Sequence, residues 1–372
     1  MALGPRDTTS LVLMTGWDAT ALQKYQLQDG TTFDAVVADM RAALGALNSE
    51  LAANPLWSGL ASYTDNPVAD YTMGSSNGFE KFTEYGRPDS KRADIEGHML
   101  PLEAFDRGLG WTWNYLRNAR MAQVEADIAD AIKDARDIYR QTILTRLLKR
   151  SDDSGVAIGL GSGGLSPGFA TTAASTGVDF TPPSYGGVNF ASTHEHYVSI
   201  AGGYTNAVFT DVKAELMEHG HMAPYNYLAS AADETSIRAL TDFIPVGSSL
   251  VRYGTTVDVA NISPDPIAPG VYPIGVISDV VIYITPGMPQ YYGFGYKSYG
   301  ARSQRNPLRI RVAKGQSAPT VTAFPDPRSG AGAVYPLQYM MLFTEFGVGV
   351  GDRTNGTPRY VNNATWSDGT PT

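Results

Sequence analysis

The chain has 372 residues, of which 43% are apolar and 17% charged, and its formal net charge is −9. This length supports two or three packed units, and the acidic balance argues against a protein that wraps nucleic acid, because phosphate binding depends on Lys and Arg. The absence of cysteine excludes disulfides, thiolate metal sites and cysteine nucleophiles. No apolar run reaches the ~18 residues of a membrane span and no export signal is recognisable, so the sequence predicts a soluble protein.

The N-terminal part of the chain predicts a helix followed by a charged arm. Apolar residues spaced by three and four predict a helix over 32–53, which Asn54-Pro55 ends. Charged residues are dense between Glu80 and Arg107, with single apolar residues among them. This mixture favours an extended hairpin that packs on a neighbouring subunit, and an exposed loop is the alternative.

A long helix over 116–150 is the most distinctive predicted element. Its apolar residues recur about every 3.7 positions, which is close to the period of a straight helix. At about 1.5 Å per residue it would extend roughly 50 Å, which favours a structural spine over a catalytic element. The residues of the predicted buried stripe are Met121, Val124, Ile128, Ile132, Ala135, Tyr139, Ile143 and Leu147.

The rest of the chain mixes short helices with strands, so the predicted fold class is α+β. Residues 151–193 are rich in Gly, Ser, Thr and Pro and predict loops and short strands. The aromatic segment 291–300 predicts a turn or an intersubunit contact, because it lacks the basic groove of a single-strand binding site. Helices are predicted over 205–219, ending at Gly220, and over 233–243, capped by Asp233; strands are predicted over 225–229, 276–285 and 335–350.

Three local motifs resemble catalytic signatures, but their context argues against each. The GxGxxG match at 159–164 does not open a predicted helix, as a dinucleotide-binding loop must. The GxSxG match around Ser166 places Pro167, which has no N–H, where an oxyanion donor is needed. Asp152-Asp153 is read as solvation of a helix end. The sequence therefore predicts no catalytic or cofactor-binding residues.

Four histidines form two His-x-His pairs, His194/His196 and His219/His221. If the pairs converge beside Glu195 or Glu218, they could hold zinc, nickel or iron. The alternative is that His219 and His221 bond to the terminal carbonyls of the preceding helix. The preferred prediction assigns no metal ligands and no cofactor, and a metal-dependent enzyme built on the two pairs remains an alternative function.

The order of the predicted elements resembles the major capsid protein of tailed double-stranded-DNA bacteriophages, whose fold is shared with encapsulin shells and the herpesvirus capsid floor. Two local stretches carry the likeness most clearly. Residues 207–220 followed by 224–230 look like the helix and strand of the family's axial domain, and residues 344–353 look like its late strand returning to the peripheral domain.

The resemblance implies a division of the chain and a role. Residues 1–53 would form an N-terminal arm and helix, 54–115 the extended loop, 116–190 the peripheral domain with the spine helix, 191–330 the axial domain, and 331–372 the return to the peripheral domain and the C-terminal tail. The protein would be a non-enzymatic virion capsid subunit, assembled in the host cytoplasm.

The resemblance also implies partners. The first is the chain itself, in the pentamers and hexamers of an icosahedral head that encloses DNA without reading its sequence. Scaffolding, portal and decoration proteins are further candidate partners, and no membrane is implied. Some members of the family crosslink an arm lysine to a distant asparagine. In this chain the candidates for such a crosslink are Lys81 or Lys91 with Asn362 or Asn363. The favoured interpretation is that these lysines are solvated charges of the arm and that the asparagines belong to a polar tail. An encapsulin-like cellular compartment is the alternative shell.

Overall fold

The computed structural model describes residues 27–53, 59–72, 95–151, 168–170, 181–191, 193–246, 271–325 and 337–371. The chain divides into two compact units, which are described separately. Unit 1 comprises residues 1–53, 104–139 and 318–345, and unit 2 comprises residues 54–103, 140–317 and 346–372. Among the described residues, no helix is both long and apolar enough to cross a membrane.

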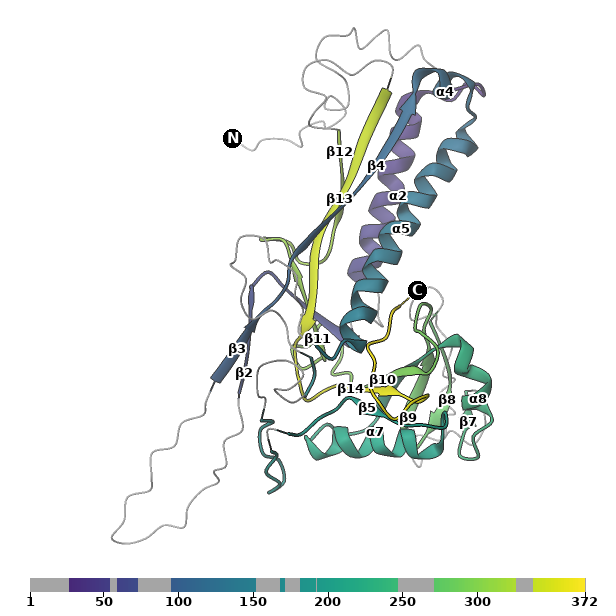
Figure 1. Ribbon diagram of the computed structural model, residues 1–372. Helices are drawn as coiled ribbons and strands as arrows, with labels where there is room; N and C mark the ends of the chain where they lie inside the picture. The colour runs from purple at the N-terminus through teal and green to yellow at the C-terminus, as the bar shows by residue number, and fades with distance from the viewer. Residues whose placement is uncertain are drawn as a thin grey trace, which may run out of the picture. The chain divides into compact units, whose positions relative to one another are not determined.

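Unit 1 contains helix α2 (Phe33–Ala53) and the first two-thirds of helix α5 (Met121–Leu148), which run alongside each other (Figure 1). The prediction of a helix over 32–53 is confirmed. An ion pair of 2.6 Å between Arg136 Nη2 and Glu50 Oε2 joins the two helices. Apolar side chains of α2 face inward, since Val36, Met40, Leu44, Leu47 and Leu51 are all buried. The spacing of three and four residues has therefore produced one buried stripe, as expected of an amphipathic helix.

The long helix is shorter than predicted. A separate helix α4 (Trp113–Asn118) precedes it, and Ala119 between them has an extended conformation with ψ of 152°. The Ala119 carbonyl accepts a hydrogen bond from the Gln28 N–H at 2.9 Å, and the Met121 N–H donates to Asp29 Oδ2 at 2.7 Å. Backbone groups that a continuous helix would use internally are thus bonded to a distant segment, and α5 begins at Met121. It also ends at Leu148, two residues early.

The buried stripe of α5 is largely confirmed. Val124, Ile128, Tyr139, Ile143 and Leu147 are buried with at most 5% exposure. The other predicted members, Met121, Ile132 and Ala135, are only partly buried. Ala131, which was not predicted to be part of the stripe, is buried. The apolar period thus predicted the buried face of α5 correctly, although the centre of this face is slightly rotated from the predicted stripe.

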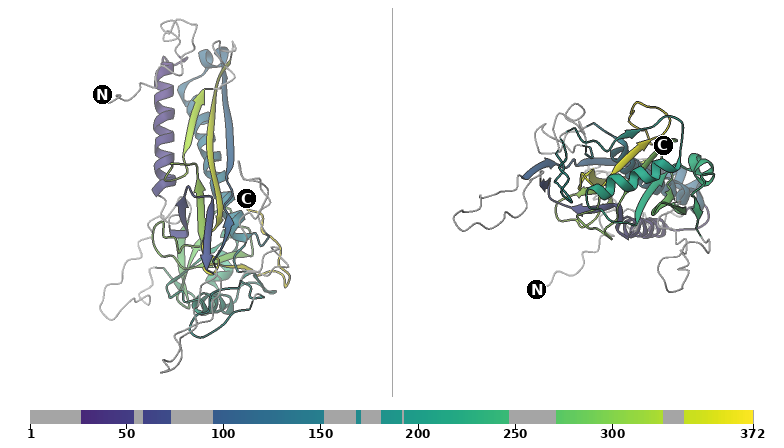
Figure 2. Two further views of the ribbon diagram at one scale, coloured as in Figure 1. Left: turned by 90° about the vertical axis from the view of Figure 1, so that its left-hand side faces the viewer. Right: turned by 90° about the horizontal axis from the view of Figure 1, so that it is seen from below.

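Five strands form a sheet in the order β1 (Ala61–Thr64), β11 (Leu308–Val312), β13 (Leu337–Val350) and β12 (Val321–Pro325), with β4 (Glu103–Thr112) also pairing with β13. Strand β13 confirms the strand predicted over 335–350. In unit 1, α2 lies alongside the long strands (Figure 2, left). Asn48 on α2 binds the edge of β12, donating to the Val321 carbonyl at 3.0 Å and accepting from the Val321 N–H at 2.8 Å.

Two strands in the arm region pair with each other. Strands β2 (Val68–Thr72) and β3 (Ile95–Met99) pair antiparallel, with Val68 opposite Met99 and Thr72 opposite Ile95. This pairing shows an antiparallel two-stranded part of the arm, while the hairpin predicted for the charged residues and its packing on a neighbouring subunit stay predictions. Residues 73–94, with most of the charges, lie outside the described residues.

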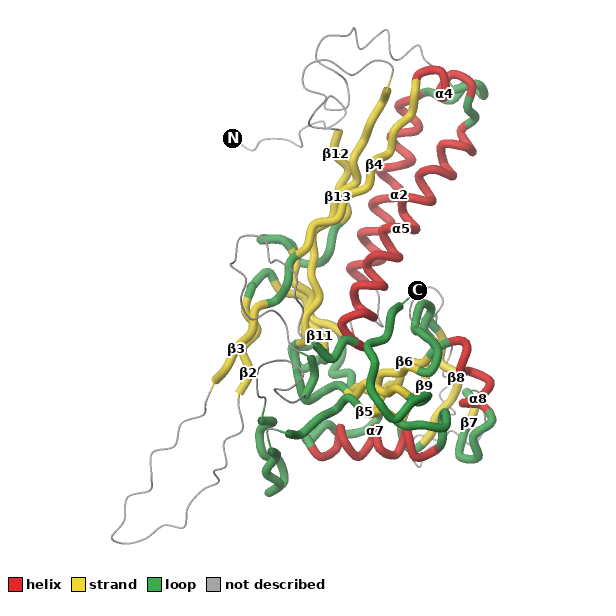
Figure 3. Tube along the Cα trace, viewed as in Figure 1, coloured by secondary structure: helices red, strands yellow, loops and turns green. Residues whose placement is uncertain are grey.

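Unit 2 is built on a seven-stranded sheet in the order β5, β14, β10, β6, β9, β8, β7. Helix α7 (Asn206–Glu218) lies along one face of this sheet (Figure 3) and buries Val208, Phe209, Val212 and Leu216 against it. The strands are β5 (Val198–Ser199), β6 (Tyr225–Ala229), β7 (Ile244–Pro245), β8 (Tyr272–Ile277), β9 (Val280–Ile284), β10 (Tyr292–Tyr296) and β14 (Thr357–Tyr360).

Helix α7 and strand β6 confirm the predicted elements over 205–219 and 225–229. The helix ends where Gly220 adopts a φ of +81°, a conformation that favours glycine. The β structure predicted over 276–285 is also confirmed, but it belongs to two strands, the end of β8 and the whole of β9. Ser278 and Asp279 have φ values of +50° and +69°, so a tight two-residue turn separates β8 from β9.

Two further predictions in unit 2 are corrected. The aromatic segment contains β10, a fully buried strand between β14 and β6, and is not a turn. Its glycines allow close packing, because a Cβ on Gly295 would lie 2.4 Å from Val212 Cγ1. The helix predicted over 233–243 is only a 3₁₀ turn (Ala231–Asp233) followed by α8 (Glu234–Arg238). Beyond it, Thr241 and Asp242 accept hydrogen bonds of 2.8 Å from Asn206 at the start of α7.

Candidate functional site

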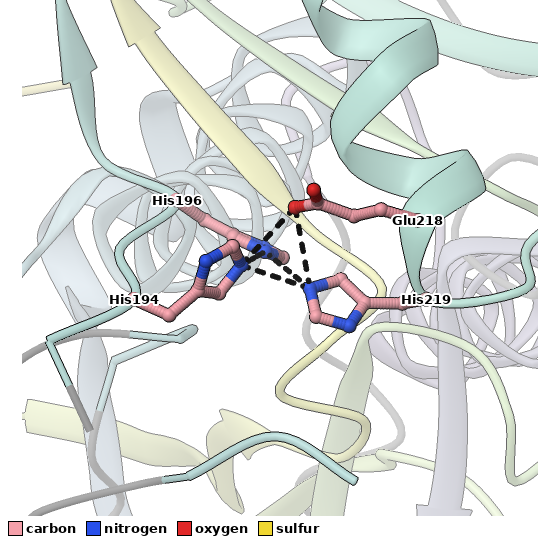
Figure 4. Close-up of side chains that lie close together, drawn as sticks. All are labelled: His194, His196, Glu218 and His219. Atoms are coloured by element: carbon pink, nitrogen blue, oxygen red, sulfur yellow. Dashed lines mark hydrogen bonds and ion pairs between the residues drawn. The ribbon is translucent and has the colours of Figure 1, made fainter. Parts of the chain in front are cut away.

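Three histidine rings converge on one point in unit 2 (Figure 4). The Nε2 atom of His194 lies 3.0 Å from that of His196 and 3.0 Å from that of His219, and the last two are 2.9 Å apart. Glu218 completes the group, with Oε1 3.2 Å from His194 Nε2 and 3.7 Å from His219 Nε2. We call these four residues the histidine cluster.

Two chain segments supply the cluster. His194 and His196 lie on the loop that leads into β5, and a hydrogen bond of 2.8 Å from the His196 N–H to the Ala170 carbonyl fixes that loop. Glu218 is the last residue of α7, and His219 follows it directly as the C-cap. The end of the helix therefore presents two adjacent side chains to the loop.

One ring of the cluster has its tautomer set by the backbone. His196 Nδ1 lies 2.8 Å from the Gly356 carbonyl oxygen, which can only accept, so Nδ1 carries the proton. In the neutral ring, Nε2 then holds a lone pair that points toward His194 and His219. Residue 356 itself must be small, because a Cβ on Gly356 would lie 2.4 Å from the ring of Phe169.

Burial keeps the rings neutral. His196 is fully buried, and desolvation, followed by the neighbouring His219 and His194, lowers its pKa well below 6.5. Burial likewise lowers the pKa of His219 to about 3, with the charges of His194 and His221 adding to the effect. The pKa of Glu218 is raised by burial and by Glu215. Neutral imidazoles are the form that binds metal.

The structure separates the two predicted His-x-His pairs. His194 and His196 point to the same place, whereas His219 joins them and His221 does not. The His221 ring contacts the Tyr299 hydroxyl at 2.7 Å and the Thr354 hydroxyl at 3.1 Å. The alternative that both rings bond to helix carbonyls is therefore wrong for this structure.

The two candidate carboxylates also differ. Glu218 belongs to the cluster, while Glu195 forms an ion pair of 2.6 Å with Arg150. Phe190 was not anticipated from the sequence, although its ring packs against those of His194 and His219 with centroids 4.9 and 4.3 Å apart. The carbonyl of Gly356 was not anticipated either, because a backbone acceptor leaves no sequence signal.

The other motifs singled out in the sequence cannot be placed. The GxGxxG match at 159–164, Ser166 with Pro167, and Asp152-Asp153 all lie outside the described residues. Lys81 and Lys91 lie outside them too, whereas Asn362 and Asn363 are exposed.

The cluster has the composition of a metal site. Three imidazole nitrogens and one carboxylate oxygen suit zinc and related divalent ions, which bind histidine and carboxylate ligands in tetrahedral geometry. Within the described ranges, it is the one group of three or more His, Asp or Glu side chains whose ligand atoms lie within 4.8 Å of one another.

Comparison of the sequence with known proteins gives no family. No family model matches the chain, and no curated protein matches it.

Comparison of the structure with solved structures gives the fold. A structure titled Mycobacterium phage Patience has a TM-score of 0.62 and 22% identity, with 93% of each chain covered. The mature capsid of bacteriophage PhiM1 has a TM-score of 0.48 and 12% identity, covering 83% of this chain and 87% of its own. The capsid of the empty GTA particle has a TM-score of 0.47 and 14% identity, covering 83% and 90%. The chain shares the fold of the structure titled Mycobacterium phage Patience. The predicted α+β fold class is confirmed by the mixture of helices and sheets in the structure, and the histidine cluster lies within this fold.

Proposed function

We propose that this protein is a major capsid subunit that assembles with copies of itself into the shell of a tailed-phage head. The observation that carries the proposal is the likeness to the structure titled Mycobacterium phage Patience, which extends over 93% of both chains. Similarity over nearly the whole length supports a role of the entire chain, and not only of one shared module.

The arm adds physical support. Strands β2 and β3 form a two-stranded sheet outside the two larger sheets. A two-stranded ribbon is at best marginally stable alone in water, so an extended hairpin gains from packing on another molecule. A neighbouring subunit in a shell would provide that surface, and residues 54–115 would then act as the extended loop.

The proposed division follows the predicted one. Residues 1–53 form the N-terminal arm and helix, 116–190 the peripheral domain with α5 as its spine, 191–330 the axial domain, and 331–372 the return and tail. The axial domain would meet its copies at the centres of pentamers and hexamers. Closed symmetric shells require such repeated contacts between identical chains.

The acidic net charge of the chain is consistent with a shell that encloses DNA. A net charge of −9 limits binding to the DNA backbone, so the shell would enclose the genome without gripping it. The role is structural and not enzymatic, the location is the virion capsid after assembly in the host cytoplasm, and scaffolding, portal and decoration proteins are the proposed further partners.

Electron microscopy of the purified full chain tests the proposal. Closed particles or capsomers support it, and monomers under every salt condition contradict it. Arg92→Glu in the arm should impair assembly while circular dichroism shows a folded chain. Lys133→Glu, on the exposed side of α5, changes the net charge equally and serves as the control. Particles that contain a cargo enzyme and no DNA would indicate the compartment shell instead.

A further inference from the structure

We propose that His194, His196, His219 and Glu218 bind one Zn²⁺ ion as a structural metal site. The residues all belong to unit 2, and the proposal does not depend on the function of the shell. It rests on the contacts between the three rings, the distances among the four ligand atoms and the burial of the group.

The contacts between the rings are the first argument. A nitrogen of a neutral imidazole is a donor if it carries a proton and an acceptor if it does not. Three nitrogens in mutual contact must therefore include at least one pair of the same kind, and such a pair repels. His196 Nε2 is already an acceptor because Nδ1 donates to Gly356. A cation that receives all three lone pairs removes the conflict.

The distances are the second argument. Zinc bonds to nitrogen and oxygen of about 2.0–2.1 Å in a tetrahedron place the ligand atoms roughly 3.3 Å apart. The three nitrogens lie 2.9–3.0 Å apart, and Glu218 Oε1 lies 3.2 and 3.7 Å from two of them. The three nitrogens thus need shifts of only a few tenths of an ångström to surround an ion, and the Glu218 carboxylate, within 4.8 Å of all three, needs a larger side-chain adjustment.

The ligand types choose the metal class. Hard ions such as Mg²⁺ and Ca²⁺ take oxygen ligands, whereas three imidazoles with one carboxylate suit Zn²⁺. Four protein ligands complete the tetrahedron, which is typical of structural sites, while catalytic zinc keeps one position for water. The site therefore predicts a stabilising ion and not the metal-dependent enzyme considered from the sequence.

The burial of the four side chains differs in a way that suits a bound ion. The side chain of His219 is 2% exposed and His196 is fully buried, whereas those of His194 and Glu218 are 20% and 36% exposed. The inner ligands are thus held in the fold, and the outer ones leave a path for entry. The hydrogen bond from His196 to Gly356 fixes a ligand ring in the manner common at zinc sites.

The first experiment measures metal in the untagged full-length chain. After equilibration with Zn²⁺ and removal of free ion, elemental analysis should find one zinc per chain, and Co²⁺ in its place should give the intense visible absorption of a tetrahedral complex. Removal of the ion by a chelator should lower Tm, and added Zn²⁺ should restore it, because an ion that binds the folded state stabilises it.

Variants assign the ion to these residues. His194→Ala should abolish stoichiometric zinc, and Glu218→Gln should weaken binding by ~10-fold or more, since even outer-sphere changes at metal sites have effects of this size. Both side chains are partly exposed, so these variants are expected to fold. His221→Gln, two residues from His219 but outside the cluster, should keep the zinc and is the matched control.

Two results would overturn the proposal. One is a natively folded chain that retains no zinc after equilibration and shows no change of Tm with Zn²⁺ or chelator. The other is zinc binding that neither His194→Ala nor Glu218→Gln weakens, which would place the ion elsewhere. Neither result bears on shell assembly, which microscopy tests separately.

Discussion

The guanidinium group of Arg359 lies 2.8 Å from the carboxylate of Glu215, with Arg359 fully buried. The pair links β14 to the inner face of α7, and the Thr357 hydroxyl donates a further hydrogen bond to the same carboxylate. Burial raises the pKa of Glu215, and Arg359 opposes that shift. A buried charge pair of this kind is sensitive to the loss of either partner.

Arg359→Met should lower the free energy of unfolding by ~3–5 kcal/mol, because it leaves the Glu215 carboxylate buried without its counter-charge. Urea unfolding followed by circular dichroism measures the change. The double variant Arg359→Met/Glu215→Leu should recover much of the loss, since it removes both charges. Lys213→Met breaks an exposed pair with Asp279 and should cost ~1 kcal/mol or less. Equal losses for the buried and exposed pairs would contradict this account.

Gly295→Ala should destabilise the protein by ~1–3 kcal/mol through overpacking. The new methyl group would lie 2.4 Å from Val212 Cγ1 and 2.9 Å from Thr357 Cγ2, between β10, α7 and β14. Gly45→Ala is the control, because nothing lies within 4 Å of a Cβ on that residue of α2. It should stabilise the helix by up to ~1 kcal/mol. Thermal unfolding compares the two, and a drop in Tm for Gly45→Ala would count against the packing assigned to α2.

Ile143→Asp should unfold the chain or destabilise it by several kcal/mol, since it places an unpaired charge at a position with no solvent exposure. Ile132→Asp should have a smaller effect because Ile132 is only partly buried. Ala122→Asp, exposed near the start of α5, should be neutral or slightly stabilising. Limited proteolysis and circular dichroism rank the three. An Ile132→Asp variant less stable than Ile143→Asp would contradict the observed position of the stripe.

Acid should destabilise the protein through His98. Burial, followed by the charge of Arg353, lowers the pKa of His98 from 6.5 to about 3, although its hydrogen bond to the Val350 carbonyl opposes the shift. Below pH 6.5 His98 becomes protonated in the unfolded state but stays neutral in the folded state. The contribution of His98 to the free energy of unfolding is therefore fully present above pH 6.5 and is lost progressively down to about pH 3.

Urea unfolding across this pH range tests the prediction, with His98→Gln as the control. The variant keeps a polar side chain without a titrating ring, so its stability should fall less steeply than that of the parent. Parallel pH profiles for the two proteins would show that His98 does not contribute. An NMR titration of the ring should place its folded-state pKa well below 6.5.

The sequence allowed helices α2 and α7 and strand β6 to be predicted because each has a clear period and a clear end, such as Gly220 after α7. The turn between β8 and β9 was missed for a physical reason. Both strands are buried, so their apolar residues form a nearly continuous run that Ser278 and Asp279 interrupt only briefly. The break before α5 was missed because its cause, the bonds to Gln28 and Asp29, is tertiary.

Only part of the candidate site could be predicted from the sequence. The spacing of His194 and His196 suggested a shared direction, and the structure agrees. Which of His219 and His221 would join them could not be predicted, because the choice depends on where the end of α7 sits relative to the loop before β5. The acceptor on Gly356 lies 160 residues from His196 and has no side chain to indicate it.

The contact between His194 and His219 joins positions 25 residues apart in a chain that has no cysteine. An ion held by both would join the two ends of that segment in the folded chain and would stabilise the fold because it binds the folded state and not the unfolded one. The occupancy of this metal link depends on the concentration of free metal, whereas a disulfide depends on the redox potential. The fold of unit 2 would then be strengthened or loosened by the zinc supply of its surroundings.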